Sequence, residues 1–379
     1  MGKENFFNVI GVADMERVHS AVIAWMLSDE CEAMNVNERS ALLNDLFKRD
    51  GQGSFASIKA YVEWNDIDIL VLTENLNGDN ECWVIENKIK TSQHSNQLEK
   101  YKEIVDEKFK DCGKHFVFLT LIGETALAGN GEWVNTTYET LMKSLEKHLN
   151  VSLDNADSVI LGEYYKSIRQ LVGVSNEFIS HPESYPTVFT DGSTKKEDKS
   201  ERHYDNETSR FIGMNGLETI FQKMYFAQVL HDVLSSSDIK CESWHIGETR
   251  GNADFAIHLN GLAKNTFLFD MAFQNGTFKF AVCRNYWTDT SAKNIREVLA
   301  WSDDMRELQK LYPDYNRMNR ARSRARISVS KKIEVNGGHW YQMPRDKFCS
   351  LVKAEFENAY DMMNDIVKIH EAKIGSGDV

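Results

Sequence analysis

Two apolar runs in the first third of the chain carry charge at positions where a buried strand normally has none. The runs are 66–72 (DIDILVL) and 83–88 (WVIENK), and both are apolar enough to form strands. A polar stretch containing the turn dipeptide Asn77-Gly78 separates them. The pattern therefore predicts an antiparallel hairpin.

This hairpin brings acidic residues together. If the chain reverses near Asn77, Asp68 lies opposite Glu86, and Lys88 projects from the same face two residues later. Two neighbouring carboxylates repel each other and need a cation, and Mg²⁺ prefers one or two carboxylates plus water. We therefore expect Asp68 and Glu86 to hold Mg²⁺ or Mn²⁺. Asp66 points to the same face and is a rival for Asp68, and the structural alternative is a buried ion pair with Lys88.

The same residues form a recognisable motif. Asp68 followed by Glu86-Asn87-Lys88 resembles the signature of the PD-(D/E)XK nuclease superfamily, although Ile67 stands where many members have proline. Two flanking stretches resemble one prokaryotic branch of it, the E-x-x-H-S of a first helix and the Q-L-x-x-Y that follows the lysine. In this chain they place Glu16, His19, Gln97 and Tyr101. The resemblance covers roughly the first 180 residues.

The resemblance implies a metal-dependent phosphodiesterase that leaves a 5′-phosphate, with DNA the preferred substrate and RNA the less favoured one. Glu16 would be a third acid of the site, completing the metal shell directly or through water, or else an exposed helix residue. Lys88 would orient the attacking water, and Gln97 and Tyr101 would support the site. His19 is either an acid–base group or a packing histidine, and the packing alternative is favoured. Many superfamily members act in restriction or anti-phage defence, which suggests the same role here.

The fold class expected is α/β, a restriction-endonuclease-like core in which a mixed central sheet is flanked by helices. A helix over 14–28, capped by Asp14, precedes the three strands of the core, the first over 57–63. The predicted elements that follow the hairpin are a helix over 95–109, a strand over 115–121, and helices over 138–148 and 157–178.

The composition changes after residue 180. Residues 181–210 are rich in polar residues and predict an exposed linker, so we expect domains at 1–180 and 211–379. The second domain is predicted to be α+β, with helices over 217–234, 291–311 and 355–372 and strands over 255–259, 266–273 and 278–283. Asp254 and Asp270 flank a turn as Asp68 and Glu86 do. A decayed second copy of the core is therefore an alternative to an unrelated domain.

A basic run near the C-terminus is the candidate nucleic-acid contact. No acid occurs from 316 to 332, and the arginines are Arg317, Arg320, Arg322, Arg324 and Arg326. In one extended strand, the last four would project from one face, which suits a phosphate backbone. The alternatives are a solvated charge run or a contact with the acidic first half of the chain.

Net charge and cysteine usage bear on the place of a nucleic-acid contact and on the cellular compartment. The 379 residues carry a net charge of −13, and residues 1–180 hold 17 Lys and Arg against 29 Asp and Glu. Any contact with nucleic acid must therefore depend on a local group of basic residues, and the second half of the chain is the more favourable place for one. The six cysteines are scattered, which fits a reducing cytoplasm, and no membrane span is expected. The main alternative to a nuclease is a non-catalytic module of the same fold that binds nucleic acid or a protein. Whether the chain forms a homo-oligomer stays an open question.

Overall fold

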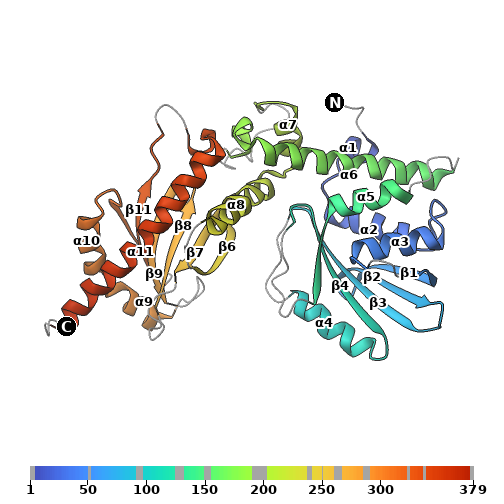
Figure 1. Ribbon diagram of the computed structural model, residues 1–379, viewed down its shortest axis with the longest axis horizontal. Coiled ribbons are helices and arrows are strands. Elements are labelled where there is room, and N and C mark those ends of the chain that lie inside the picture. The colour runs from blue at the N-terminus through green and yellow to red at the C-terminus, as the bar shows by residue number, and fades with distance from the viewer. Residues whose placement is uncertain are drawn as a thin grey trace. The chain divides into compact units, whose positions relative to one another are not determined.

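The chain divides into two compact units (Figure 1). A computed structural model describes residues 5–49, 53–90, 97–123, 132–148, 155–189, 203–236, 241–249, 251–259, 267–284, 291–321, 325–335 and 339–375. Unit 1 is Met1–Ser180 with Arg210–Ile220, and unit 2 is His181–Ser209 with Phe221–Val379. The predicted linker lies partly outside the described residues, because 190–202 are not described, and the predicted domain division stays a prediction.

Unit 1 is built on a mixed sheet of five strands in the order β1-β2-β3-β4-β5. The strands are β1 (Phe55–Trp64), β2 (Ile67–Asn75), β3 (Asn80–Lys88), β4 (Gly113–Thr120) and β5 (Trp133–Thr137). The first three pair antiparallel, whereas β3 with β4 and β4 with β5 are parallel. The parallel step from β3 to β4 requires a crossover, and helix α4 (Gln97–Lys108) supplies it.

Helices cover both faces of this sheet. The remaining helices of unit 1 with described bounds are α1 (Phe6–Val9), α2 (Glu16–Leu27), α3 (Val36–Leu46), α5 (Tyr138–His148) and α6 (Ala156–Ser180). On one face Leu98, Tyr101 and Val105 of α4 form a buried cluster with Val84 and Phe118. Helices α2 and α3 lie against strands of the same sheet. Strand β3 is covered on both faces, and its residues from Cys82 to Lys88 are all buried.

The register predicted for the hairpin is confirmed. Ile69 pairs with Ile85 and Leu70 with Val84, so Asp68 comes next opposite Glu86. The expected α/β class is confirmed as well. The predicted cap of the first helix is wrong, because its N-cap is Met15 without a side-chain bond, while the carboxylate of Asp14 contacts Lys90. Strand β5 had not been predicted.

Unit 2 contains a wholly antiparallel sheet of six strands in the order β10-β11-β9-β8-β7-β6. Its strands are β6 (Cys241–Thr249), β7 (Asn252–Leu259), β8 (Phe267–Gln274), β9 (Thr277–Arg284), β10 (Arg317–Ala321) and β11 (Arg326–Lys332). Its helices with described bounds are α8 (Glu218–Ser235), α9 (Ala292–Leu299), α10 (Ser302–Leu311) and α11 (Arg345–Gly375). Two helices cross the unit boundaries, α7 (Glu207–Met214) and the first turn of α8.

The apolar face of this sheet packs against helices. Phe226 of α8 contacts Phe255 and Phe273 of the sheet, and Phe273 also contacts Phe348 of α11. The helix predicted over 291–311 is two helices, since the chain turns at Trp301.

A second copy of the nuclease-like core is not formed in unit 2. Asp254 pairs with Gln274 and Asp270 with His258, so the two aspartates do not face each other. The sheet is also antiparallel throughout and lacks the parallel step of unit 1. The default alternative, an unrelated α+β domain, is the one the topology supports.

Candidate active site

The end of strand β3 brings three predicted site residues together. Lys88 Nζ lies 2.6 Å from Glu86 Oε1 and 3.9 Å from Asp68 Oδ2. Because side chains alternate along a strand, Glu86 and Lys88 share one face of β3, the face that carries Val84 and packs against α4. The sheet thus holds two carboxylates around one ammonium group.

Glu86 lies in an environment that does not suit an isolated carboxylate. Its side chain is 0% exposed. Neither of its carboxylate oxygens accepts a hydrogen bond of ordinary geometry from the described residues, although the Lys88 ammonium forms an ion pair with one of them. Burial, and then the neighbouring Asp68 carboxylate, raise the pKa of Glu86 to about 8. A buried, incompletely satisfied carboxylate of this kind favours a bound cation.

Burial and neighbouring charges also shift the pKa of Asp68 and of Lys88. Burial raises the pKa of Asp68, while Lys88 and the backbone amide of Asn87 oppose that shift. For Lys88 burial lowers the pKa, but Glu86 and Asp68 outweigh it and the net pKa is raised. Lys88 therefore stays protonated, because it faces two acids.

Glu16 reaches the same end of β3 from helix α2. Its Oε1 accepts hydrogen bonds from the backbone amides of Ile89 and Lys90, at 2.9 Å and 2.8 Å. The carboxylate acts electrostatically on Asp68 and Lys88. Helix α2 thus delivers Glu16 next to the site. Glu16 Oε1 is engaged by backbone amides, and its part in the metal shell, directly or through water, stays a prediction.

Asn87 is a positioning residue that the sequence analysis missed. Its backbone amide donates to Asp68 Oδ2 at 2.9 Å. Its side chain is 0% exposed and projects from the other face of β3, where Nδ2 donates to the Glu16 carbonyl at 3.1 Å and to Ser20 Oγ at 3.0 Å. Tyr138 Oη donates to Asn87 Oδ1 at 2.7 Å. The signal was present, since a polar residue on the strand face of Trp83 and Ile85 requires buried partners.

His19 occupies a closed hydrogen-bonded niche. Its Nε2 lies 2.9 Å from the Ala13 carbonyl, and its Nδ1 lies 3.1 Å from Tyr164 Oη. A carbonyl only accepts, so Nε2 carries the proton and Nδ1 accepts from the tyrosine. Burial lowers the pKa of His19 to about 4. Both ring nitrogens are used inside the protein, which favours the packing alternative.

Gln97 and Tyr101 lie on the α4 side of the site. Gln97 Nε2 donates to Tyr101 Oη at 2.7 Å, and Tyr101 Oη donates to the Asp66 carbonyl at 2.5 Å. Burial raises the pKa of Tyr101, and the Glu86 carboxylate adds to that shift. The pair therefore ties α4 to the turn before Asp68. The side chain of Asp66, the rival acid, pairs with Lys100 on the surface.

The described residues fit a metal with few protein ligands. No group of three or more His, Cys, Asp or Glu side chains within the described ranges is arranged to hold a metal ion. Asp68 and Glu86 are two hard oxygen donors, and Glu86 has unsatisfied oxygens. Mg²⁺ is usually bound by one or two carboxylates and keeps several waters, so this donor set fits Mg²⁺ or Mn²⁺ rather than a closed structural metal site.

The predicted row of arginines is not one strand. Strand β10 ends at Ala321 and pairs back with β11, which begins at Arg326, so the run folds into a hairpin. Arg320 pairs with Ile327, which places Arg320 and Arg326 on opposite faces of the sheet. Arg326 is committed to a buried ion pair with Asp270 at 2.9 Å. The remaining two members, Arg322 and Arg324, lie outside the described residues.

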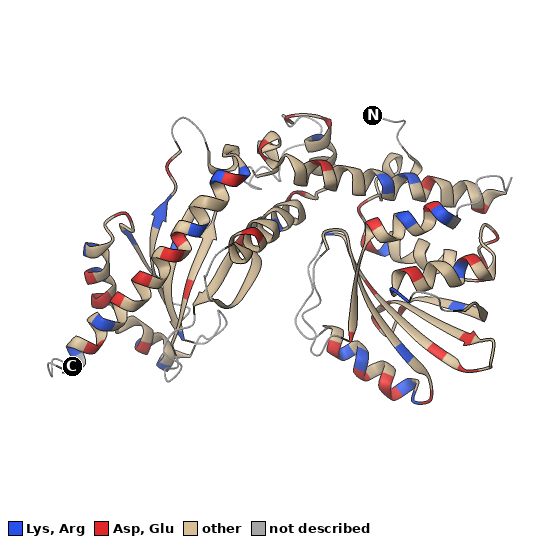
Figure 2. Cartoon of the chain, in the orientation of Figure 1, with Lys and Arg blue, Asp and Glu red and all other residues tan. Residues whose placement is uncertain are grey.

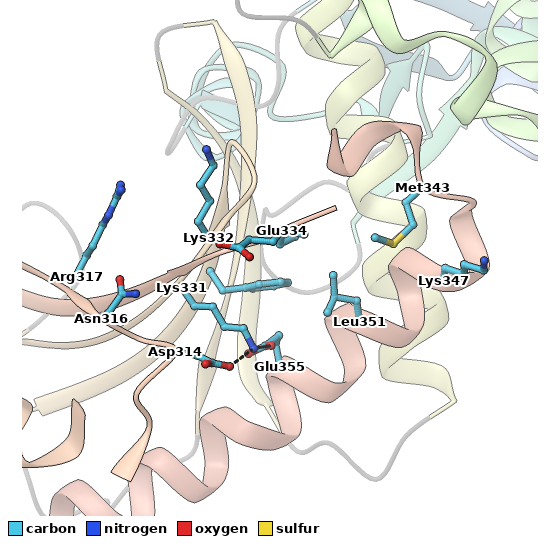
Figure 3. Close-up of a pocket in the computed structure, with 12 residues that line it drawn as sticks. Asp314, Asn316, Arg317, Lys331, Lys332, Glu334, Met343, Lys347, Leu351 and Glu355 are labelled. Atoms are coloured by element: carbon cyan, nitrogen blue, oxygen red, sulfur yellow. Dashed lines mark hydrogen bonds and ion pairs between the residues drawn. The ribbon is translucent and has the colours of Figure 1, made fainter. Parts of the chain in front are cut away.

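Unit 2 also contains a pocket of about 620 Å³ between β11 and the start of α11 (Figure 3). Lys331 turns into it and pairs with Glu355 at 2.9 Å and Asp314 at 3.3 Å. Arg317 and Lys332 also border the pocket, but they belong to the opposite face of the sheet from Lys331, because strand residues alternate. The pocket lining is therefore mixed, because the Lys331 ion-pair group and other polar side chains lie beside the apolar Phe278, Ile333, Met343 and Leu351.

Comparison with known proteins bears on the first unit. The family model described as PD-(D/E)XK nuclease superfamily matches residues 4–166. This range contains Asp68, Glu86, Lys88 and the helices that flank them. No curated protein and no solved structure matches the chain. None of the helices in the described part of the chain has the length and hydropathy that crossing a membrane requires.

Proposed function

Residues 4–166 belong to the PD-(D/E)XK nuclease superfamily, and from this premise we propose that the chain hydrolyses phosphodiester bonds of nucleic acid, with DNA preferred over RNA. The observation that supports the proposal most strongly is Glu86, whose buried carboxylate lies beside Asp68 and Lys88 and has unsatisfied oxygens. A role in restriction or anti-phage defence is part of the proposal and rests on the superfamily alone.

In this mechanism Asp68 and Glu86 hold Mg²⁺ or Mn²⁺. When bound, the ion lowers the pKa of water and neutralises charge on the scissile phosphate. Lys88 orients the attacking water and stabilises the negative charge that grows on the phosphate oxygens. Glu16 and Asn87 fix the end of β3 through their backbone contacts, and Tyr101 with Gln97 fixes the turn that precedes Asp68.

A non-catalytic binding module remains a second candidate, and one observation favours it. Lys88 already compensates Glu86, because its ammonium lies 2.6 Å from Glu86 Oε1. In that case the site would be a buried ion-pair cluster inherited with the fold, and nucleic acid would be bound without being cut.

The deciding experiment is a cleavage assay with purified full-length protein and Mg²⁺ or Mn²⁺. Supercoiled plasmid, linear duplex, single-stranded DNA and RNA should be compared, each with and without chelator. Asp68→Ala and Glu86→Ala should each abolish cleavage and also abolish the metal-dependent rise in melting temperature, because an ion bound only by the folded state stabilises it. Cleavage that both variants retain in chelator would remove this site from the mechanism.

A further inference from the structure

Three strands of the second sheet form an acid-free region. Neither Asp nor Glu occurs within β9, β10 or β11, in a chain whose net charge is −13. Figure 2 shows basic residues at the end of β11. A local excess of positive charge in an acidic protein requires a separate explanation, because overall charge would not attract a polyanion.

The register gathers three basic residues on one face. Arg317 pairs with Ser330, and Ser330 pairs with Lys279, so these residues form a row across β10, β11 and β9. Lys332 lies two residues after Ser330 and therefore shares its face. We call Lys279, Arg317 and Lys332 with the central Ser330 the basic face. The basic face is not visible in the linear sequence, because its residues come from three different strands.

The basic face lies opposite the apolar side of the sheet. Phe278 and Phe280 of β9 and Val329 of β11 are 0% exposed and belong to the side that packs on helices. Arg317 and Lys332 are exposed, and Figure 3 shows both side chains extended in the same direction. The basic face is thus available to a partner at its β10 edge.

These charges are not neutralised within the described structure. Arg317, Lys332 and Lys279 form no ion pair with any described residue, and Lys279 Nζ donates to the neutral amide of Gln274. Burial, and then the nearby Arg326, lower the pKa of Lys279. An anion placed here would therefore meet two exposed cations, Arg317 and Lys332, and the half-buried Lys279, on which the Asp254 and Asp270 carboxylates also act.

We propose that the basic face binds the phosphate backbone of nucleic acid. The choice of partner rests on the proposed nuclease function, whereas the surface belongs to the unit that does not carry the candidate active site. Phosphate is recognised by cations and by hydrogen-bond donors such as the Ser330 hydroxyl and the Asn319 side-chain amide. Strands β9 to β11 place no aromatic side chain on this face, so base stacking does not contribute and binding is independent of sequence.

The test is the salt dependence of binding, measured by fluorescence anisotropy in chelator so that nothing is cleaved. Labelled duplex DNA, single-stranded DNA and RNA serve as separate probes. The double variant Arg317→Ser/Lys332→Ser should bind more weakly. Its slope of log affinity against log salt should be flatter by about 0.9 per lost contact for duplex and about 0.7 for single strands. The preferred probe identifies which nucleic acid supplies the backbone.

The chain offers a matched control. Arg296→Ser/Lys347→Ser removes the same charge from exposed residues of helices α9 and α11, which are not part of the basic face. This control should keep the parent protein's slope. Lys279→Gln should flatten the slope by the amount expected for the loss of one phosphate contact. If both double variants lose the same affinity, or if the parent protein does not bind, the proposal that the basic face binds nucleic acid is wrong. The metal-dependent stabilisation through Asp68 and Glu86 is measured without nucleic acid, so it reports separately on the proposed function.

Discussion

The backbone amide of Asn87 donates a 2.9 Å hydrogen bond to the Oδ2 of Asp68, while the Asn87 side chain holds helix α2 from the other face of the strand. One residue therefore links a proposed metal ligand to the helix that delivers Glu16. Replacing Asn87 by Ala should weaken Mn²⁺ binding by about 10- to 100-fold, as is usual for residues that orient metal ligands. Isothermal titration with Mn²⁺ measures this without any need for cleavage.

Tyr138→Phe is the matched variant for Asn87. It removes only the hydroxyl that donates to Asn87 Oδ1 at 2.7 Å and keeps the ring. We expect a smaller loss of Mn²⁺ affinity, and less than additive effects in the double variant, because both changes disturb one hydrogen-bond network. If Asn87→Ala lowers the melting temperature but leaves Mn²⁺ affinity unchanged, the residue has only a structural role.

Lys88→Met should separate catalysis from binding. The ammonium lies 2.6 Å from Glu86, and its removal takes away the group that stabilises charge in the reaction. Cleavage should fall by about 100-fold or more, in line with the loss of one stabilising donor at an active site. Nucleic-acid affinity in chelator should stay at the parent value. Cleavage within a few-fold of the parent would show that Lys88 is only a structural counter-ion.

His19 should make the protein sensitive to acid. Its pKa is lowered from 6.5 to about 4 in the folded state, so the unfolded chain binds a proton more readily. Stability is therefore complete above the unfolded pKa and decreases as the pH falls from about 6.5 to about 4, by roughly 3 kcal/mol. Urea titrations across this range should show a shallower decline for His19→Gln. Parallel curves for the two proteins would contradict a buried neutral histidine, and cleavage at neutral pH should be largely kept.

Arg326 should behave as a structural residue and not as a nucleic-acid contact. Its partner Asp270 is 0% exposed, and the Arg326 side chain is only 16% exposed. Arg326→Ala leaves a buried carboxylate without its cation and should lower the free energy of unfolding by about 3 to 5 kcal/mol. Urea unfolding measures the loss, and Asp270→Asn in the same chain should restore part of it. A salt slope of binding that becomes as flat as that of Arg317→Ser/Lys332→Ser would show that Arg326 contacts nucleic acid in addition to Asp270.

The hairpin of unit 1 could be predicted because its information is local. A turn dipeptide and two strands with period-two patterning determine which residues face each other, and the observed pairing of Ile69 with Ile85 confirms that register. The motif also fixed the positions of Gln97 and Tyr101, whose side chains bond to each other. In both cases residues close in sequence are close in space.

The parts that could not be predicted depend on long-range contacts. The arginine run appeared continuous, but Ala321 pairs with Arg326, and only the sheet as a whole shows that the run reverses there. The role of Asn87 depends on Ser20 and Tyr138, which lie 67 and 51 residues away. Lys279 was not a candidate, because its distance in sequence from Arg317 hides the row they form across β11.

Strand β3 is hydrogen-bonded along both edges, to β2 on one side and to β4 up to the pairing of Lys88 with Thr120. Where the ladder with β2 ends, the amide of Asn87 is taken up by Asp68 and the amides of Ile89 and Lys90 by Glu16. In terms of amide hydrogen exchange, this segment has few routes for local opening and should exchange at the rate of global unfolding of unit 1. The backbone that carries Glu86 and Lys88 therefore keeps its geometry until the sheet opens. The backbone arrangement of the site should therefore be lost only when unit 1 unfolds as a whole.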